Sequence, residues 1–253
     1  MTNKASDYLC MALDGFDIFQ ENHIYAEEFR QRLRSKVELI SWVKIGMEVF
    51  YSGKVECIEI AKGYGYKVFL DLKLKDIAYD TIKNTSTVLA SRGVDLFNVH
   101  ADGGSKMMKA SVEGAEIASQ RMGIPRPKII GVTVLTSMDE KDLYEIGLHS
   151  TTKEQVLRLA LLAQESGMDG IVCSALDLEY LKPELPEDFI YVTPGIRLPE
   201  NNTIGQKRIA TPQLAFENGS TLQVIGRPLY ENKTIVQQVQ AAMDFNSIIK
   251  ELL

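Results

Sequence analysis

Short apolar segments of strand type alternate along the chain with longer segments that carry an amphipathic helical pattern. The clearest helical segments, at 25–37, 151–167 and 232–253, combine an apolar stripe with charged positions. Eight further segments are rich in β-branched and aliphatic residues: 7–14, 41–46, 67–73, 96–101, 128–135, 170–174, 189–195 and 221–226. This alternation predicts a series of strand–helix units.

The strand segments are mostly apolar throughout instead of alternating between polar and apolar positions. Such strands are expected to be buried on both faces, as in a parallel sheet covered by helices. Eight units in 253 residues fit a closed (β/α)8 TIM barrel better than an open doubly wound sheet, which is the second choice. No Pro-rich or Gly/Ser-rich linker interrupts the series, so residues 1–253 are predicted to form a single α/β barrel domain.

Composition narrows the range of partners and compartments. The formal net charge is −6 and the basic residues form no long run, so neither nucleic acid nor an anionic membrane surface is expected as a partner, whereas an anionic small molecule fits. Cys10, Cys57 and Cys173 lie far apart, which is typical of a reducing cytosol and not of a disulfide framework or a zinc site. The sequence has no export signal and no apolar run of the roughly 18 residues that span a membrane, so a cytoplasmic protein is expected.

Charged residues stand where the predicted strands end. In a (β/α)8 barrel the chemistry takes place at the C-terminal ends of the strands, so these side chains are expected to gather around one cavity. No spacing of His and carboxylate residues suggests a metal site there. The residues that end or closely follow a predicted strand are Asp14, Lys44, Asp71, Lys73, His100, Arg197 and Arg227.

The segment KVFLDLKLKDIAYDT (67–81) carries the densest group of charges. Asp71 and Lys73 are expected on the same side of their strand, Asp76 in the connection beyond it, and Lys44 within reach of Asp71 from the neighbouring strand. A structural salt bridge at the barrel mouth would explain one Asp-x-Lys pair equally well, but a cluster of four charges favours a function. Two carboxylates beside Lys73 would stabilise its ammonium form and make it a proton donor.

The motifs ALD, VKIG, LDLKLKDI, NVHADGG, LTS, VTPGIR and VIGR together resemble the orotidine 5′-phosphate decarboxylase family almost from end to end. The Asp-x-Lys-x-x-Asp element is shared by a wider superfamily of sugar-phosphate barrels, whereas its combination with Lys44 and Arg227 is specific. The resemblance implies a cofactor-free homodimer that converts orotidine 5′-phosphate into uridine 5′-phosphate, the last step of de novo pyrimidine nucleotide synthesis. It also implies a catalytic set of Lys44, Asp71, Lys73 and Asp76, with Asp76 reaching into the partner subunit's site.

The resemblance also assigns substrate-binding positions. The phosphate is expected over the last two strands, where such barrels commonly bind it, at Gly226 and Arg227, with Arg197 in the same region. Gln206 is expected to bridge to the phosphate; it follows the polar segment 198–205, which either folds over the phosphate or forms an ordinary surface loop. The other implied contacts are Asp14 and Lys44 at the ribose and Thr136 at the pyrimidine edge.

One segment departs from the family pattern. After the second aspartate the family commonly continues Ile-Pro-x-Thr, whereas this chain reads Ile77-Ala78-Tyr79-Asp80-Thr81. The proline is missing and the threonine falls one residue late, as though the connection had gained a residue. A ribose contact is therefore assigned to Thr81 or, in its place, to Asp80.

Two other functions are compatible with parts of the pattern. A magnesium-dependent sugar-phosphate decarboxylase or aldolase of the same superfamily shares the Asp-x-Lys-x-x-Asp element but resembles V-E-I-G at the second strand, where this chain has Lys44. A lysine there would repel Mg²⁺, which prefers oxygen ligands. The second alternative is a barrel that binds a nucleotide without catalysis, because a fold does not fix a function.

Overall fold

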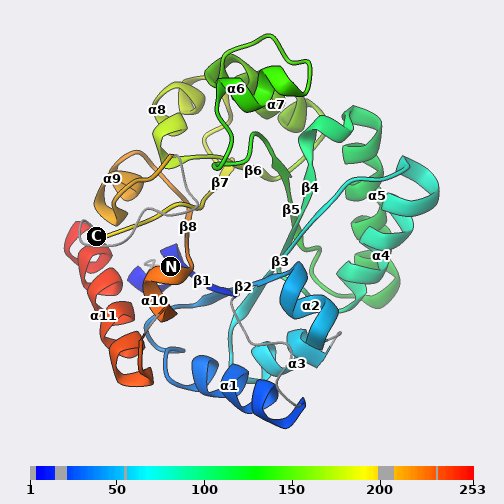
Figure 1. Cartoon of the computed structure of the whole chain (residues 1–253). Coiled ribbons are helices and arrows are strands. Elements are labelled where there is room, and N and C mark those ends of the chain that lie inside the picture. The colour runs from blue at the N-terminus through cyan, green and yellow to red at the C-terminus, as the bar shows by residue number, and fades with distance from the viewer. Residues whose placement is uncertain (1–3, 15–21, 54–55, 199–207, 232) are drawn as a thin grey trace.

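Eight parallel strands close into a barrel in chain order in the computed structural model (Figure 1). The structure describes residues 4–14, 22–53, 56–198, 208–231 and 233–253. Each predicted strand segment overlaps one observed strand, so the (β/α)8 barrel is confirmed and the open doubly wound sheet is not found. The strands are β1 (Leu9–Leu13), β2 (Trp42–Gly46), β3 (Lys67–Leu74), β4 (Leu96–His100), β5 (Lys128–Val132), β6 (Gly170–Val172), β7 (Ile190–Thr193) and β8 (Leu222–Ile225).

The longer helices lie outside the ring of strands (Figure 1). The three segments with the clearest helical pattern overlap α1, α7 and α11. No helix in the described ranges is both long and apolar enough to span a membrane. The α-helices are α1 (Asn22–Arg34), α2 (Met47–Gly53), α3 (Glu56–Gly63), α4 (Lys83–Ser91), α5 (Ser105–Met122), α6 (Glu140–Glu145), α7 (Thr152–Glu165), α8 (Leu178–Leu181), α9 (Pro212–Glu217), α10 (Arg227–Tyr230) and α11 (Ile235–Leu252). The short turns are η1 (Ala5–Tyr8), the π-helix η2 (Ala78–Ile82), η3 (Ala101–Gly103), η4 (Ala175–Asp177) and η5 (Lys182–Glu184).

Two apolar cores explain why the strands are apolar on both faces. The outer core lies between strands and helices, and the inner core fills the barrel itself. In β1, for example, Leu9 and Met11 face the helices while Cys10 and Ala12 face the barrel interior. The fully buried members of the inner core are Cys10, Ala12, Phe69, Leu96, Ile130, Val192, Leu222 and Val224.

Strand β3 is irregular near its C-terminal end. Its register against β4 shifts between Leu70 and Leu74. Lys73, within this stretch, has φ +50°, and among the described non-glycine residues it is the only one with positive φ. The strand therefore does not follow a regular period of two where its charged residues lie.

Candidate active site

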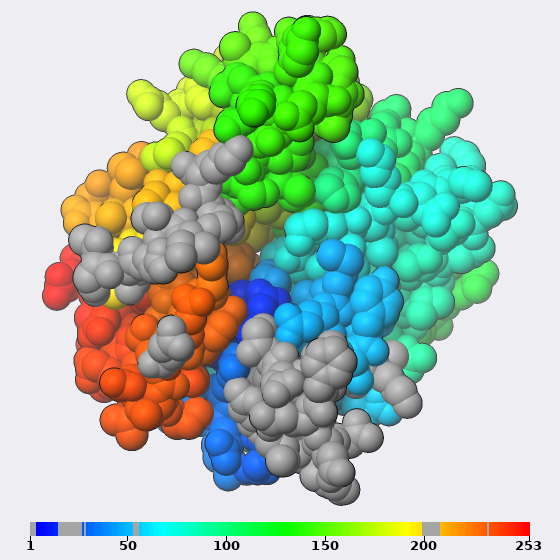
Figure 2. All heavy atoms as spheres, viewed as in Figure 1, coloured from blue at the N-terminus to red at the C-terminus, as the bar shows by residue number. Residues whose placement is uncertain are grey.

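A cavity of about 290 Å³ opens where the strands end, near the middle of the face shown in Figure 2. Its volume is close to the lower end of the range for small-molecule pockets, roughly 300 Å³. Its apolar lining includes Ala12, Phe69, Val132, Val172, Val192 and Val224, which come from six different strands. Its polar lining includes Asp14, Lys44, Asp71, Lys73, Thr136, Ser137, Arg197, Arg227 and Tyr230.

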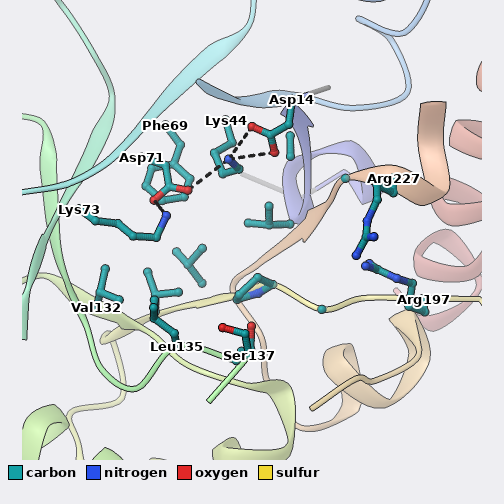
Figure 3. Close-up of a pocket in the computed structure, with 18 of the residues that line it drawn as sticks. Asp14, Lys44, Phe69, Asp71, Lys73, Val132, Leu135, Ser137, Arg197 and Arg227 are labelled. Carbon is teal, nitrogen blue, oxygen red and sulfur yellow. Dashed lines mark hydrogen bonds and ion pairs between the residues drawn. The ribbon is translucent and has the colours of Figure 1, made fainter. Parts of the chain in front are cut away.

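Four side chains of alternating charge form one wall of the cavity (Figure 3). Lys44 Nζ lies 3.2 Å from Asp71 Oδ2 and 3.3 Å from both carboxylate oxygens of Asp14. Lys73 Nζ lies 2.7 Å from Asp71 Oδ1. The order is thus Asp14, Lys44, Asp71, Lys73, and the structure brings together the charges that the sequence placed at the ends of the first three strands.

Burial and ion pairing act in opposite directions on this array. Burial by itself would raise the pKa of Asp71, but Lys44 and Lys73, with hydrogen bonds from Lys73 and Asn98, lower it to about 2. Burial would lower the pKa of Lys44, and the carboxylates of Asp71 and Asp14 instead raise it above its ordinary value. Asp71 and Lys44 are therefore both ionised at neutral pH.

The absence of a side chain at one glycine leaves space for the contact between Asp14 and Lys44. Gly46 ends β2, and a Cβ built there would lie 3.0 Å from Asp14 Oδ1 and 3.1 Å from Lys44 Nζ. Any larger residue would press on the contact between these two side chains. The sequence interpretation used the VKIG motif for Lys44 and did not anticipate this role of its glycine.

Two arginines face the cavity from the side opposite Lys73 (Figure 3). Arg197 follows β7, Arg227 begins α10, and their guanidinium groups point toward one another. Burial, and next to it the charge of Arg227, lower the pKa of Arg197. Two cations held close together suit a doubly charged anion, which would relieve their repulsion. Gly226, beside them, also lines the cavity; a Cβ there would meet Ala12 and Tyr230 at ordinary contact distance, 3.6 Å, so the glycine leaves space open.

Not all of the other predicted site residues are found in the cavity lining. Asp76 is exposed, does not line the cavity, and accepts a hydrogen bond from its neighbour Ile77 N at 2.6 Å. Thr81 is half-buried and also lies outside the cavity lining. Gln206 lies outside the described residues. Thr136 lies within the cavity lining and is buried.

The connection after β3 contains a turn of π-helix, η2. Ile82 N donates to Ile77 O at 2.9 Å, a bond that spans five residues instead of the four of an α-helix. A π-turn takes up one residue more than an α-turn, which accounts for the extra residue between Asp76 and Thr81. Thr81 lies within this π-turn. Whether Thr81 or Asp80 contacts a ribose stays a prediction.

Several side chains that support the site were not found from the sequence. Asn98 of β4, 1 % exposed, bonds to both Asp71 and the backbone of Lys73. Its one sequence signal is a polar residue inside the apolar run LFNVH. Arg32 of α1 donates to Asp14 O at 2.9 Å and its guanidinium lies 4.6 Å from the centre of the Tyr230 ring, so it supports two parts of the cavity wall.

Arg208 ties the connections after β5 and β6 together. It forms a part-buried ion pair with Asp177, 2.8 Å from Oδ2, and donates to Val134 O at 3.2 Å. Val134 lines the cavity two residues before Thr136. No sequence pattern indicated Arg208, because its partners lie 31 and 74 residues away.

Within the described ranges, no group of three or more His, Cys, Asp or Glu residues is arranged to hold a metal ion. The ammonium of Lys44 lies between the carboxylates of Asp14 and Asp71, in the space that a cation bridging them would need.

Comparisons with known proteins agree with one another. The family model described as orotidine 5′-phosphate decarboxylase / HUMPS family matches residues 7–242. Orotidine 5′-phosphate decarboxylase of Bacillus cereus (strain AH187) is 46% identical over 205 residues, which cover 78% of this chain and 85% of that protein. The crystal structure of orotidine 5′-phosphate decarboxylase from Lactobacillus acidophilus superimposes with a TM-score of 0.77 at 35% identity, covering 95% of this chain and 98% of that one. The enzyme of the same name from Pyrococcus horikoshii OT3 has a TM-score of 0.66 at 19% identity and is similar in fold.

Proposed function

The chain belongs to the orotidine 5′-phosphate decarboxylase / HUMPS family, and on this premise we propose that it is a decarboxylase that converts orotidine 5′-phosphate into uridine 5′-phosphate. The observation that carries the proposal is the Asp14–Lys44–Asp71–Lys73 array on one wall of a cavity whose opposite side holds Arg197 and Arg227. A nucleotide bound with its phosphate at the arginines would place its pyrimidine toward the lysines. The enzyme would catalyse the last step of de novo pyrimidine nucleotide synthesis.

Lys73 is the proposed proton donor. When the bond between ring carbon six and the carboxylate breaks, the electron pair stays on the ring carbon and CO2 leaves. The ammonium of Lys73 stabilises this charge and then transfers a proton from Nζ to the carbon, after which solvent reprotonates the amine. No cofactor is needed as an electron sink in this scheme.

Asp71 acts mainly by organising the two lysines. Its charge beside the substrate carboxylate would contribute repulsion of roughly 4 kcal/mol at 4 Å and an effective dielectric near 20. Enzymes lower barriers by roughly 8 to 23 kcal/mol, so stabilisation of the transition state must supply most of the effect. The contacts of Asp71 with both Lys44 and Lys73 support the organising role.

The other contacts are assigned from the family resemblance, and the lining of the cavity by Asp14, Lys44, Thr136 and Gly226 supports four of them. Asp14 and Lys44 are assigned to the ribose, Thr136 to the pyrimidine edge, and Gly226 to the phosphate beside the two arginines. Gln206 and either Thr81 or Asp80 complete the set as predictions.

The magnesium-dependent alternative is disfavoured by Lys44. In such an enzyme a carboxylate at this position would add a metal ligand, whereas here an ammonium already neutralises Asp14 and Asp71. A barrel that only binds nucleotides would not need Lys73 beside Asp71.

We also propose that the barrel works as a single catalytic domain and as a homodimer. Apolar side chains are exposed on the segments that follow β2 and β3, with Met47 48%, Tyr51 74%, Ile77 67% and Tyr79 59% exposed. A second copy of the chain covering this surface would bury them and would bring Asp76 toward the partner's cavity. A cytoplasmic location stays a prediction.

The test follows the absorbance of orotidine 5′-phosphate with purified protein in excess chelator. Loss of substrate absorbance with formation of uridine 5′-phosphate is expected. Turnover that appears only after addition of Mg²⁺ would favour the metal-dependent alternative, and binding without turnover would favour the non-catalytic barrel.

A further inference from the structure

The backbone at Lys73 is held in a conformation that an L-residue avoids. Its φ of +50° lies in the left-handed region, which is unfavourable for a non-glycine residue because its Cβ approaches the following carbonyl oxygen. The register of β3 against β4 shifts around this position, so the regular ladder of backbone hydrogen bonds does not hold it. Some other interaction must stabilise the turn that directs the ammonium back to Asp71.

The side chain of Asn98 provides that interaction. On β4, Leu96 faces the barrel interior and Phe97 the helices, so Asn98 points inward again, directly beneath the charged array. Lys73 N donates to Asn98 Oδ1 at 2.8 Å, and Asn98 Nδ2 donates to Asp71 Oδ1 at 2.7 Å. A backbone N–H can only donate and an ionised carboxylate can only accept, so the two partners fix the orientation of the amide.

We propose that Asn98 is a positioning residue of the decarboxylase site, whose amide fixes both the left-handed turn at Lys73 and the rotation of the Asp71 carboxylate. Asn98 does not line the cavity, so it acts through these two residues and not on the substrate. The inference rests on the proposed function, because it concerns how the proposed proton donor is held.

Asparagine is the side chain that meets both demands. Aspartate would still accept from Lys73 N–H, but when ionised it has no proton to donate and would repel Asp71. Leucine has a similar size and can make neither bond, which would leave the N–H of Lys73 and Oδ1 of Asp71 without this partner.

The aspartate variant also gives a signature that depends on pH. Asp71 stays ionised beside its two lysines. When the pH falls and one of the two adjacent carboxyl groups takes up a proton, the proton would therefore reside on the group introduced by Asn98→Asp. The neutral acid can donate to Asp71 Oδ1 and accept from Lys73 N–H, as the amide does. The other titratable groups around this contact are Lys44 on β2, Cys10 on β1, and His100 at the end of β4, which lies near Asp102. On β5 the residue paired with Asn98 is Ile130, which has no titratable group. All of these are present in the wild type, so the ratio of variant to wild-type activity isolates the new group.

The experiment compares Asn98→Asp, Asn98→Leu and the wild type in decarboxylation between pH 5.5 and pH 8. At pH 8 both variants are expected to lose about 10- to 100-fold in kcat with KM changed less than about threefold, because misplaced reacting groups cost up to about 10²-fold. As pH falls, the ratio of Asn98→Asp to wild-type activity should rise at least fivefold, whereas that of Asn98→Leu should stay flat. If Asn98→Leu does not fold, the pH dependence of Asn98→Asp decides alone.

The matched control is Asn246→Asp, since Asn246 Nδ2 donates to Leu39 O at 2.7 Å at the other end of the barrel. It should alter stability while leaving kcat and its pH dependence unchanged. Folded Asn98 variants with wild-type kcat and a wild-type pH profile would overturn the proposal and leave Asn98 with a structural role.

A measurement without substrate separates this proposal from the proposed function. Carboxyl carbon NMR of the free protein should show Asp71 titrating at a higher pH in Asn98→Leu than in the wild type. An unchanged Asp71 titration would refute the positioning role, whatever the wild type does to orotidine 5′-phosphate. Failure of the wild-type protein to decarboxylate, with the titration shifted, would refute the proposed function alone.

Discussion

Lys73 Nζ lies 2.7 Å from Asp71 Oδ1. Both residues belong to β3, and the regular geometry of this strand is interrupted at Lys73, which has a positive φ. Because the other oxygen of Asp71 lies 3.2 Å from Lys44, one buried carboxylate holds two ammonium groups. Of these two lysines, Lys44 is fixed between two carboxylates. Lys73 has a single carboxylate partner among the described residues and is the one available to a substrate.

Replacement of Lys73 by Ala should reduce kcat by roughly 10³-fold or more, because proton donation and stabilisation of the carbanion are lost together. Binding of uridine 5′-phosphate should change little, because the ammonium is needed chiefly in the transition state. Steady-state kinetics and product titration measure the two effects. Lys67→Ala, at the exposed start of the same strand, is the control. Activity of Lys73→Ala within tenfold of the wild type would remove Lys73 from the role of proton donor.

Replacement of Arg227 by Ala should weaken binding of uridine 5′-phosphate by about 10- to 100-fold, since a charge-assisted hydrogen bond contributes roughly 1.5–3 kcal/mol. Arg197→Ala should have an effect in the same direction, because the two guanidinium groups face one another across the same part of the cavity. Affinities are compared by calorimetry for the nucleotide and for uridine, which lacks the phosphate. Equal losses for both ligands would show that these arginines do not hold the phosphate.

The barrel and the charged array could be read from the sequence because both follow from short-range rules. Apolar runs identify buried parallel strands, and the C-terminal ends of such strands meet at one edge. Gly46 of β2 pairs with Asp71 of β3, so the long side chain of Lys44 reaches its carboxylate without any special geometry. A pattern of charges at strand ends is sufficient to predict such a contact.

The supporting contacts could not be read in the same way. The left-handed conformation of Lys73 depends on Asn98, which is supplied by another strand 25 residues later. The one-residue excess after Asp76 was visible in the sequence, but no residue type in this segment indicated that a π-turn would accommodate it. A sequence pattern carries the types of residue and their spacing, and these features depend on tertiary contacts between distant segments.

Lys36 should make stability depend on pH in the alkaline range. It is fully buried, and its ammonium donates to Arg32 O, Ser35 Oγ and Gln238 Oε1, all of which are uncharged. Burial, and next to it the charge of Arg32, lower its pKa to about 8. In the unfolded chain a lysine has a pKa of about 10.4, so between these values the unfolded state binds more protons and the free energy of unfolding rises with pH.

Urea unfolding at pH 7 and pH 10 measures this effect in the wild type and in Lys36→Met. Because one pKa unit corresponds to about 1.36 kcal/mol, the wild type should gain up to about 3 kcal/mol relative to the variant as pH rises through this window. The exposed Lys250→Met variant should follow the wild type. A constant difference between wild type and Lys36→Met at both pH values would mean that Lys36 titrates normally in the folded protein.

Asp76 is exposed and lies outside the cavity lining of its own chain, while apolar side chains beside it, Ile77 and Tyr79, are also exposed. In a two-fold dimer the same patch of each chain meets its counterpart. A residue on this patch that reaches the partner's site therefore does so in both directions, once from each chain. If Asp76 works in this way, Lys73 and Asp76 of one site come from different chains. Variants of these two residues should then complement one another.

The test mixes two inactive proteins, Lys73→Ala and Asp76→Ala, which are unfolded and refolded together. In a mixed dimer one site lacks both residues and the other retains both, so the second site should be active. Random association makes about half the dimers mixed, and roughly a quarter of all sites should recover wild-type activity. A tag on one variant verifies exchange, and each variant refolded alone is the control. If exchange is verified and activity does not rise, Asp76 serves its own chain, because every site in the mixture would then lack one of the two residues.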